Sequence, residues 1–480
     1  MEPFNLASYF VDRHVAEGRG HRTAIVYEGR RYTYAEIARL VNQAGSALRH
    51  AGVDRGDRVL IVLPDSPDFA AAYFGAIKIG AVAVPTSTAL RPADYEQLAA
   101  DSQAKIVVSK PLWQAESPAP PLDPAPTAPD DPAFWLWTSG STGPPKAAVH
   151  RHADWLVSCE GYAQGVLGIR PDDVTFSSAK LFHAYGLGNG LMFPFYVAAT
   201  TVLYPGKPQA AAILACAHEH RPTLFFAVPT HYAAMLHEAS RETDAPHPYD
   251  LTSVRLGVSA AEPLPAEIVR RWRERFGFDV LDGIGSTEVL HIYISNRPGG
   301  VRPGSTGVPV PGYELRITDE TGRELPAGET GDLWVRGRSN ATHYWNRPQL
   351  TAERMRDGWF FSGDKYRADA DGYYWYAGRS DDMFRVSGEW VSPIEVESAL
   401  IEHDAVLEAA VVARPDVDGL PVACAFVTLK RPDRASEALA GELTGFVRER
   451  LAGYKRPRRI EFLDELPKTA TGKVQRYKLR

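Results

Sequence analysis

The sequence of 480 residues has little cysteine and no excess of positive charge. Its three cysteines, Cys159, Cys216 and Cys424, are far apart and form no Cys-x-x-Cys pair, so neither a disulfide framework nor a zinc site is expected. Because 53 Lys and Arg stand against 59 Asp and Glu, the net charge is -6. We therefore expect no nucleic-acid partner, and an anionic ligand would need a local site.

Long apolar runs are also lacking. The longest such stretch, residues 191–204, is too short for a membrane span and contains Pro194, which favours a buried core segment. The first residues show no basic region followed by an apolar run, so no secretion signal is recognised. These observations predict a soluble cytoplasmic protein with no membrane contact.

The sequence does show a regular alternation of helical and strand patterns. Residues 34–50 carry apolar side chains at helical spacing after Thr33, a suitable N-cap, and residues 68–79 follow a second helical pattern. Residues 58–63 and 81–85 are short apolar runs typical of strands covered on both faces. This alternation predicts an α/β fold with a largely parallel sheet.

The later parts of the chain differ in pattern. The proline-rich residues 118–132 indicate an extended connector, and short alternating strands in 305–340 indicate a small antiparallel unit. Beyond residue 381 a helix, two strands and a helix follow in order. Since 480 residues exceed one compact core, we expect two domains, residues 1–379 and 380–480.

A loop rich in hydroxyls and glycines follows the strand that ends at Trp137. Its glycines allow backbone N–H groups to turn toward one point, and its lysine adds positive charge, so it suits a polyphosphate. The GxxxxGK[ST] pattern of a Walker A loop does not fit it. The predicted phosphate-binding residues are Thr138, Ser139, Gly140, Ser141, Thr142, Gly143 and Lys146.

This loop resembles the phosphate loop of the adenylate-forming superfamily, which includes acyl- and aryl-CoA ligases, nonribosomal peptide adenylation domains and firefly-type luciferases. One departure is Ala147, where the family usually has glycine. Further segments match in order along essentially the whole chain. The resemblance implies a large N-terminal domain of α/β subdomains with a small β-barrel-like subdomain, and a small mobile α+β C-terminal domain. It also implies that ATP activates a carboxylic acid as an acyl-adenylate.

The matching segments imply roles for individual residues. The motif at residues 282–288 implies that Thr287 contacts the α-phosphate and that Glu288 binds Mg²⁺, a hard cation that prefers oxygen ligands. Asp364 and Arg379 match the family's ribose contacts. The rest of the ATP site is implied to consist of Asp282, Gly283, Ile284 and Gly285, and of an adenine segment that lines the adenine site with backbone groups, Ser259, Ala260, Ala261 and Glu262.

The C-terminal segments complete the match. Lys473, in the pattern Pro-Lys-Thr-x-x-Gly-Lys, matches the catalytic lysine, whose ammonium can bridge a carboxylate and phosphate oxygens. Asp381 matches the hinge on which the C-terminal domain rotates. The loop containing Gly388, Glu389 and Trp390 resembles the one that helps to form the pantetheine tunnel for coenzyme A.

The segment at 180–189 bears on the choice of acid. It has no acidic residue, whereas adenylation domains for α-amino acids place an aspartate there, so an amino-acid substrate is disfavoured. The segment most resembles benzoate-CoA ligases. That resemblance implies that His183 either faces an ortho substituent or simply fills an aromatic position. A flat ring would be surrounded by Ala184, Tyr185, Ala227, Gly283, Ile284 and His291.

The predicted function is therefore that of an AMP-forming aryl-carboxylate:CoA ligase that uses ATP, Mg²⁺ and coenzyme A on benzoate or a substituted benzoate such as anthranilate. One alternative is a stand-alone aryl adenylation enzyme that loads a carrier protein. A noncatalytic scaffold is disfavoured, because Lys146, Glu288, Asp364 and Lys473 occur together. The oligomeric state is left open, a homodimer included.

Overall fold

The computed structural model describes most of the chain. For Trp390 it describes the backbone alone. The described residues are 3–114, 121–138, 145–240, 249–380, 382–386, 389–416, 420–468 and 474–480. Within them no helix is long and apolar enough to cross a membrane.

The predicted N-terminal helices are present. Helix α2 (Tyr34–His50) begins at Thr33, whose hydroxyl accepts a hydrogen bond from the amide of Glu36 while the Glu36 carboxylate accepts one from the amide of Thr33. This reciprocal arrangement is a capping box. Helix α2 packs against α3 (Pro67–Lys78), and the preceding segment contains α1 (Arg13–Ala16).

A six-stranded sheet, in the order β17-β7-β6-β4-β3-β5, contains the predicted apolar strands. Strands β3, β4, β5 and β6 are parallel, β7 pairs antiparallel with β6, and β17 pairs antiparallel with β7. Helix α4 (Pro92–Ser102) precedes β5. The strands are β3 (Arg58–Ile61), β4 (Val82–Pro85), β5 (Ala104–Val108), β6 (Pro132–Thr138), β7 (Lys146–Arg151) and β17 (His343–Tyr344).

A nine-stranded sheet has the order β14-β13-β12-β11-β10-β8-β9-β1-β2. Its central strands are parallel and buried, so their carboxyl ends meet at one edge, where α/β proteins bind ligands. The strands are β1 (Thr23–Tyr27), β2 (Arg30–Thr33), β8 (Val174–Ser177), β9 (Thr200–Leu203), β10 (Leu224–Ala227), β11 (Leu256–Ser259), β12 (Val280–Gly285), β13 (Ile292–Ser295) and β14 (Val308–Pro309).

Helices join the strands of the nine-stranded sheet. A buried aromatic group around Trp272, with Phe225 and Tyr232, packs α9 and α10 against β10. The helices are α5 (Asp154–Ser158), α6 (Ala184–Leu187), α7 (Phe193–Val197), α8 (Ala210–His220), α9 (Pro229–Ser240) and α10 (Ala266–Phe276).

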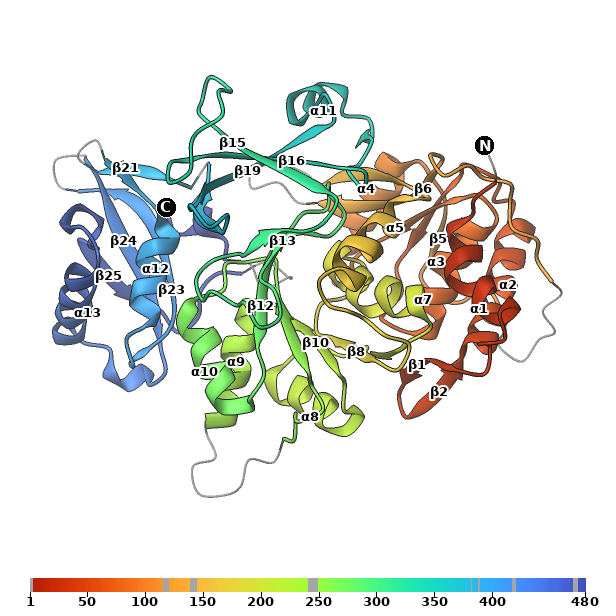
Figure 1. Ribbon diagram of the computed structural model, residues 1–480, viewed down its shortest axis with the longest axis horizontal. Coiled ribbons are helices and arrows are strands. Elements are labelled where there is room, and N and C mark those ends of the chain that lie inside the picture. Colours follow the sequence, from red (N-terminus) through yellow and green to blue (C-terminus); the bar gives the residue numbers. More distant parts are fainter. Residues whose placement is uncertain are drawn as a thin grey trace.

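The predicted antiparallel unit is a five-stranded sheet, ordered β15-β16-β19-β18 with β20 paired to β19. In Figure 1 it crosses the top of the molecule, above the strands β12 and β13. Its elements are β15 (Tyr313–Thr318), β16 (Thr330–Gly337), α11 (Pro348–Arg354), β18 (Met355–Arg356), β19 (Trp359–Ala368) and β20 (Tyr374–Arg379).

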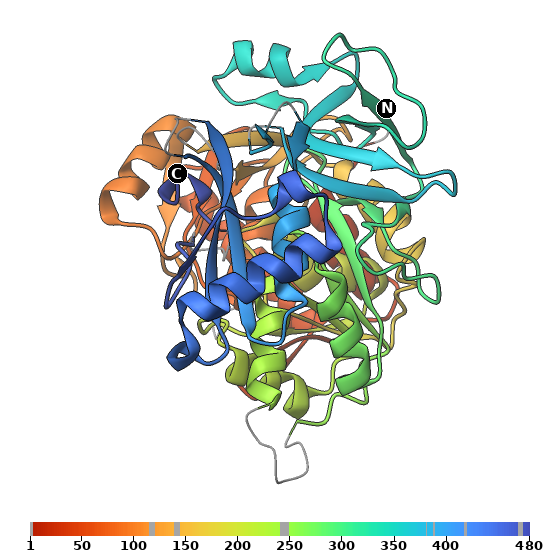
Figure 2. The same ribbon diagram turned by 90° about the vertical axis from the view of Figure 1, so that its left-hand side faces the viewer.

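The C-terminal part has its own core, which includes Val396, Leu400, Val411, Val427 and Leu443. It lies at one end of the molecule in Figure 1 and faces the viewer in Figure 2. The order of helix, two strands and helix is as predicted. The elements are β21 (Phe384–Val386), β22 (Glu389–Val391), α12 (Pro393–Ile401), β23 (Val406–Pro415), β24 (Pro421–Leu429), α13 (Glu437–Arg450) and β25 (Arg459–Phe462).

Candidate active site

The predicted adenine segment and the predicted aryl pocket meet at the carboxyl ends of three parallel strands. Ala227, at the end of β10, is paired in register with Ser259 of β11, and Ser259 is paired with Asp282 of β12. All three are buried. Residues far apart in the sequence are therefore side by side at the edge of the sheet where ligands bind.

Four charged residues that are predicted to bind ATP or its Mg²⁺ ion converge near this edge. Asp364 on β19 lies directly opposite Arg379 on β20, and the Arg379 guanidinium donates to Asp364 Oδ1 at 3.2 Å. Burial raises the pKa of Tyr293 well above its usual range, and the nearby charges of Asp364 and Glu288 raise that pKa further. Tyr293 is thus near both the Asp364 carboxylate, predicted to contact the ribose, and the Glu288 carboxylate, predicted to bind Mg²⁺.

Lys146 is close to the same group. It is the first residue of β7, and burial lowers the pKa of its ammonium, while the charge of Glu288 opposes that shift and those of Arg354 and Arg379 add to it. A partly buried ammonium among carboxylate and guanidinium groups is a suitable contact for phosphate oxygens. Arg354 was not singled out in the sequence, because it belongs to no recognised motif.

Glu288 is buried, with 6% of its surface exposed. Tyr344 on β17 donates its hydroxyl hydrogen to Glu288 Oε1 at 2.6 Å. Burial, and then the charge of Glu288, raise the pKa of Tyr344, so this hydroxyl keeps its hydrogen. Tyr344 does not stand out in the sequence, because only the pairing of β17 with β7 brings it to the Glu288 carboxylate.

The backbone is strained at two predicted ATP-site segments. Ala261 and Leu290 both have a φ of 80°, a left-handed conformation that costs a residue with a side chain about 1 to 3 kcal/mol. Ala261 lies in the predicted adenine segment, and Leu290 follows Glu288. Such strain persists where the surrounding structure fixes the backbone for a ligand.

Part of the predicted phosphate loop is described. Thr138, the last residue of β6, pairs in register with Lys146, so the two ends of the loop are adjacent. Ser139, Gly140, Ser141, Thr142 and Gly143 lie outside the described residues.

The predicted aryl pocket centres on Tyr185 and His291. The Tyr185 hydroxyl donates to the carbonyls of Val258 at 3.0 Å and Ala227 at 3.3 Å, which fixes the ring against the ends of β10 and β11. The His291 ring centroid is 5.7 Å from that of Tyr185 and 4.5 Å from that of Phe193. These rings form a largely apolar wall.

His291 is buried, and this burial lowers its pKa to about 3. The ring is therefore neutral at physiological pH. A Cβ atom on Gly188 would lie 2.5 Å from the His291 ring, so only glycine fits there. Gly283 and Ile284 pair with Ser295 and Ile294 of β13 and continue the wall.

The remaining predicted residues lie around this group. His183 precedes α6, and Ala184 begins it. The Glu262 carboxylate accepts a hydrogen bond from the Thr230 hydroxyl at 2.8 Å. Burial raises the pKa of Asp282 well above its usual range, which favours an uncharged carboxyl beside the aromatic side chains.

The C-terminal part approaches the site through its last strand-like segment. Lys468 bonds Glu408 at 2.7 Å, and its charge adds to burial in lowering the pKa of His231, on α9, to about 4. Lys468 also pairs with Val474. Three predicted residues lie outside the described part of the chain: Asp381, Gly388 and Lys473. Strand β22 contains Glu389 and the backbone of Trp390.

A metal site made by the protein alone is not found in the described part of the chain. No group there brings together three or more His, Cys, Asp or Glu side chains in a metal-binding arrangement. Glu288 is a single buried carboxylate with one oxygen bonded to Tyr344. A single carboxylate suits a Mg²⁺ ion that is held mainly by substrate phosphates. Such an ion usually takes only one or two carboxylates from a protein.

Comparison with known families agrees with this geometry. Residues 12–345 match the model of the AMP-binding enzyme family, and residues 395–473 match the model of the AMP-binding enzyme C-terminal domain. The chain belongs to the AMP-binding enzyme family, whose members form adenylates. The family resemblance and the fold class predicted from the sequence are both confirmed.

Individual relatives are similar along their whole length. The benzoate–CoA ligase of Thauera aromatica is 48% identical, and the match covers 100% of this chain and 96% of that protein. A benzoate CoA ligase structure from Burkholderia xenovorans LB400 has a TM-score of 0.90 at 44% identity, covering 99% and 100% of the two chains. An anthranilate CoA ligase structure in complex with anthranoyl-AMP has a TM-score of 0.93 at 40% identity, covering 100% and 97%.

Proposed function

We propose that this protein is an AMP-forming aryl-carboxylate:CoA ligase. The observation that supports this most directly is the convergence of Lys146, Glu288, Asp364 and Arg379 beside a wall of aromatic rings at the carboxyl edge of the parallel strands. Similarity to benzoate and anthranilate CoA ligases over whole chains supports the same assignment.

In the first half-reaction the carboxylate oxygen attacks the α-phosphorus of ATP. The bond between that phosphorus and the bridging oxygen breaks, and pyrophosphate leaves. Lys146 binds the phosphates, Thr287 contacts the α-phosphate, and the Asp364 carboxylate accepts hydrogen bonds from the ribose hydroxyls. Lys473 bridges the two anions and stabilises the developing charge, which lowers the barrier by positioning and electrostatics.

Glu288 is the residue that would hold Mg²⁺ together with the phosphates. A bound Mg²⁺ supplies positive charge that offsets the charge of the leaving pyrophosphate. Tyr344 orients the Glu288 carboxylate by its 2.6 Å hydrogen bond.

In the second half-reaction the sulfur of coenzyme A attacks the acyl carbon. The carbon–oxygen bond to AMP breaks, the thiol loses its proton, and an aryl-CoA thioester forms. We propose that residues 380–480 rotate about Asp381 between the half-reactions. This rotation withdraws Lys473 and brings the loop of Gly388, Glu389 and Trp390 to the site.

The proposed acid is benzoate or a small substituted benzoate. Tyr185, Ile284 and the neutral His291 provide flat and largely apolar surroundings, which suit a benzene ring better than a bulky polar acid. His183 either faces an ortho amino or hydroxyl group or fills an aromatic position, and substituted benzoates distinguish these interpretations.

The test is pyrophosphate exchange with benzoate, anthranilate, salicylate and the hydroxybenzoates, followed by mass spectrometry with coenzyme A present. The expected result is exchange with at least one aryl acid and formation of the matching aryl-CoA. Aryl-AMP that accumulates without aryl-CoA would instead favour transfer to a carrier-protein thiol. Absence of exchange with every acid would refute the adenylation chemistry itself.

A further inference from the structure

The backbone of residues 287–289 is held by hydrogen-bond donors from other segments of the chain. β12 ends at Gly285 and β13 begins at Ile292, so this segment belongs to neither strand. Three successive carbonyls each accept a hydrogen bond from another element. The pairs are His150 Nε2 to Thr287 at 2.8 Å, the Ala341 amide to Glu288 at 2.7 Å, and the Ser339 hydroxyl to Val289 at 2.8 Å.

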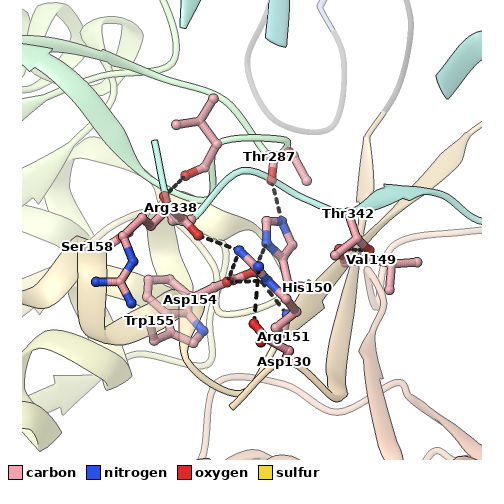
Figure 3. A network of polar contacts seen from close by, with 12 residues as sticks. Asp130, Val149, His150, Arg151, Asp154, Trp155, Ser158, Thr287, Arg338 and Thr342 are labelled. Carbon is pink, nitrogen blue, oxygen red and sulfur yellow. Dashed lines mark hydrogen bonds and ion pairs between the residues drawn. The ribbon is translucent and has the colours of Figure 1, made fainter. Parts of the chain in front are cut away.

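His150 is the one ring side chain among these three donors. It lies on β7, is fully buried, and stacks on Phe134 with ring centroids 5.2 Å apart. Its Nδ1 is 3.1 Å from Asp154 Oδ2, and Figure 3 shows the ring between that carboxylate and the Thr287 carbonyl. The ring thus connects Asp154 on one side with the backbone of Thr287 on the other.

Asp154 is fixed as the carboxylate partner. Only 1% of its surface is exposed, and it accepts bonds from the amide of Arg151 to Oδ2 and from Arg151 Nε to Oδ1, each at 2.9 Å. The His150 ring is therefore held by a carboxylate that the protein itself fixes, and its Nε2 is directed at the Thr287 carbonyl.

The same strand also anchors the other two donors. The Arg151 guanidinium donates to the carbonyl of Arg338, and the amide of Thr342 donates to the carbonyl of Val149 at 3.0 Å. Residues 338–342, which contain Ser339 and Ala341, are thus tied to β7 (Figure 3). β7 begins at Lys146, so the strand after the phosphate loop sets the position of the Thr287–Glu288 backbone.

We propose that His150, held by Asp154, is a positioning residue for the adenylation step. It acts through the Thr287 carbonyl to keep Thr287 and Glu288 at a fixed distance from Lys146 and the phosphate loop. The inference rests on the proposed function, in which those residues contact the α-phosphate and Mg²⁺. A merely structural histidine would fill the same space but would have no specific effect on the rate of adenylation.

Two isosteric variants separate these roles. In His150→Gln the amide nitrogen reproduces Nε2 and can still donate to Thr287, whereas in His150→Asn it reproduces Nδ1 and can donate only to Asp154. We expect His150→Asn to lower kcat of pyrophosphate exchange by roughly 10²-fold, the scale of a 1 Å displacement of reacting groups. His150→Gln should recover at least a tenth of the wild-type rate, with KM for the aryl acid unchanged in both variants.

Thermal unfolding and the thioester half-reaction from supplied aryl-AMP are measured on the same preparations. Equal losses in both variants that follow the loss of Tm would overturn the proposal. If His150→Asn does not fold, Asp154→Asn replaces it, because it leaves the imidazole in place and removes the carboxylate that holds it. Wild-type kcat in folded Asp154→Asn would likewise overturn the proposal. A wild-type enzyme without exchange on any acid would instead refute the proposed function.

Discussion

Tyr344 contacts two of the charged groups at the site at once. Its hydroxyl donates to Glu288 Oε1 at 2.6 Å, and the Lys146 ammonium lies 4.6 Å from the centroid of its ring. The ring therefore holds a cation on its face, while the hydroxyl orients a carboxylate. Tyr344 links the lysine that follows the phosphate loop to the carboxylate proposed to hold Mg²⁺.

Tyr344→Phe should weaken adenylation without unfolding the protein. It removes a hydrogen bond to a charged group, which is worth about 1.5 to 3 kcal/mol, so we expect pyrophosphate exchange to fall roughly 10- to 100-fold. The Mg²⁺ concentration for half-maximal rate should rise, because Glu288 is no longer oriented. Tyr34→Phe is the control, since its buried hydroxyl bonds the carbonyl of Ala199 at 2.7 Å, away from the site. Equal effects of the two substitutions would contradict the assignment.

Lys473→Ala should separate the two half-reactions. The ammonium is proposed to act only while pyrophosphate leaves, so adenylate formation should fall at least 10²-fold, as when one preorganised electrostatic group is lost. Formation of aryl-CoA from supplied aryl-AMP should stay within about threefold of wild type, a difference of under 1 kcal/mol. Lys478→Ala, an exposed lysine in the same tail, is the control. Parallel loss of both half-reactions would refute the domain rotation.

Arg476 should be required for the stability of the C-terminal part. Its guanidinium bonds Glu397 at 2.9 and 2.7 Å, and Glu397 Oε1 also accepts from the amide of Val411 at 2.7 Å. Arg476→Met leaves a buried carboxylate without its cation, which should cost about 3 to 5 kcal/mol. The measurement is hydrogen exchange of α12 and β23 amides. The double variant with Glu397→Gln should recover most of the loss, because glutamine still accepts from Val411; no recovery would argue against the ion pair as the cause.

Stability should fall as the pH is lowered from 6.5 to about 4. Burial lowers the pKa of His152 to about 4 and that of His291 to about 3, below the usual 6.5. Between these values the unfolded chain binds protons that the native rings do not, so acid favours unfolding by up to about 3 kcal/mol per ring. Urea unfolding at pH 7.5, 6.0 and 5.0 measures the slope. His152→Gln should flatten it and the exposed His50→Gln should not; unchanged slopes in both would contradict this origin.

Local patterns in the sequence predicted the secondary structure well. Thr33 and Glu36 form their capping box within one helical turn, and β3 and β4 follow directly from short apolar runs. The order of helix, strands and helix after residue 381 was also predictable, because each element has its own apolar periodicity. These features depend on neighbours in the chain.

Contacts between distant residues could not be predicted in this way. Tyr344 reaches Glu288 only because β17 pairs with β7, and His150 reaches Thr287 across 137 positions of sequence. Neither residue stands out locally, since a tyrosine and a histidine in buried strands commonly serve packing alone. The three-dimensional arrangement was needed to show which polar atoms they face.

The sequence alone determined the family and the kind of chemistry, and it predicted the main charged residues, Lys473 among them. Those inferences depend on residue types at fixed spacing, which the sequence states directly. Only the tertiary structure decided how β7 holds the Thr287–Glu288 backbone and how Tyr344 orients the carboxylate. The physical reason is that hydrogen bonds and burial join atoms by distance in space, and sheet pairing sets that distance independently of sequence separation.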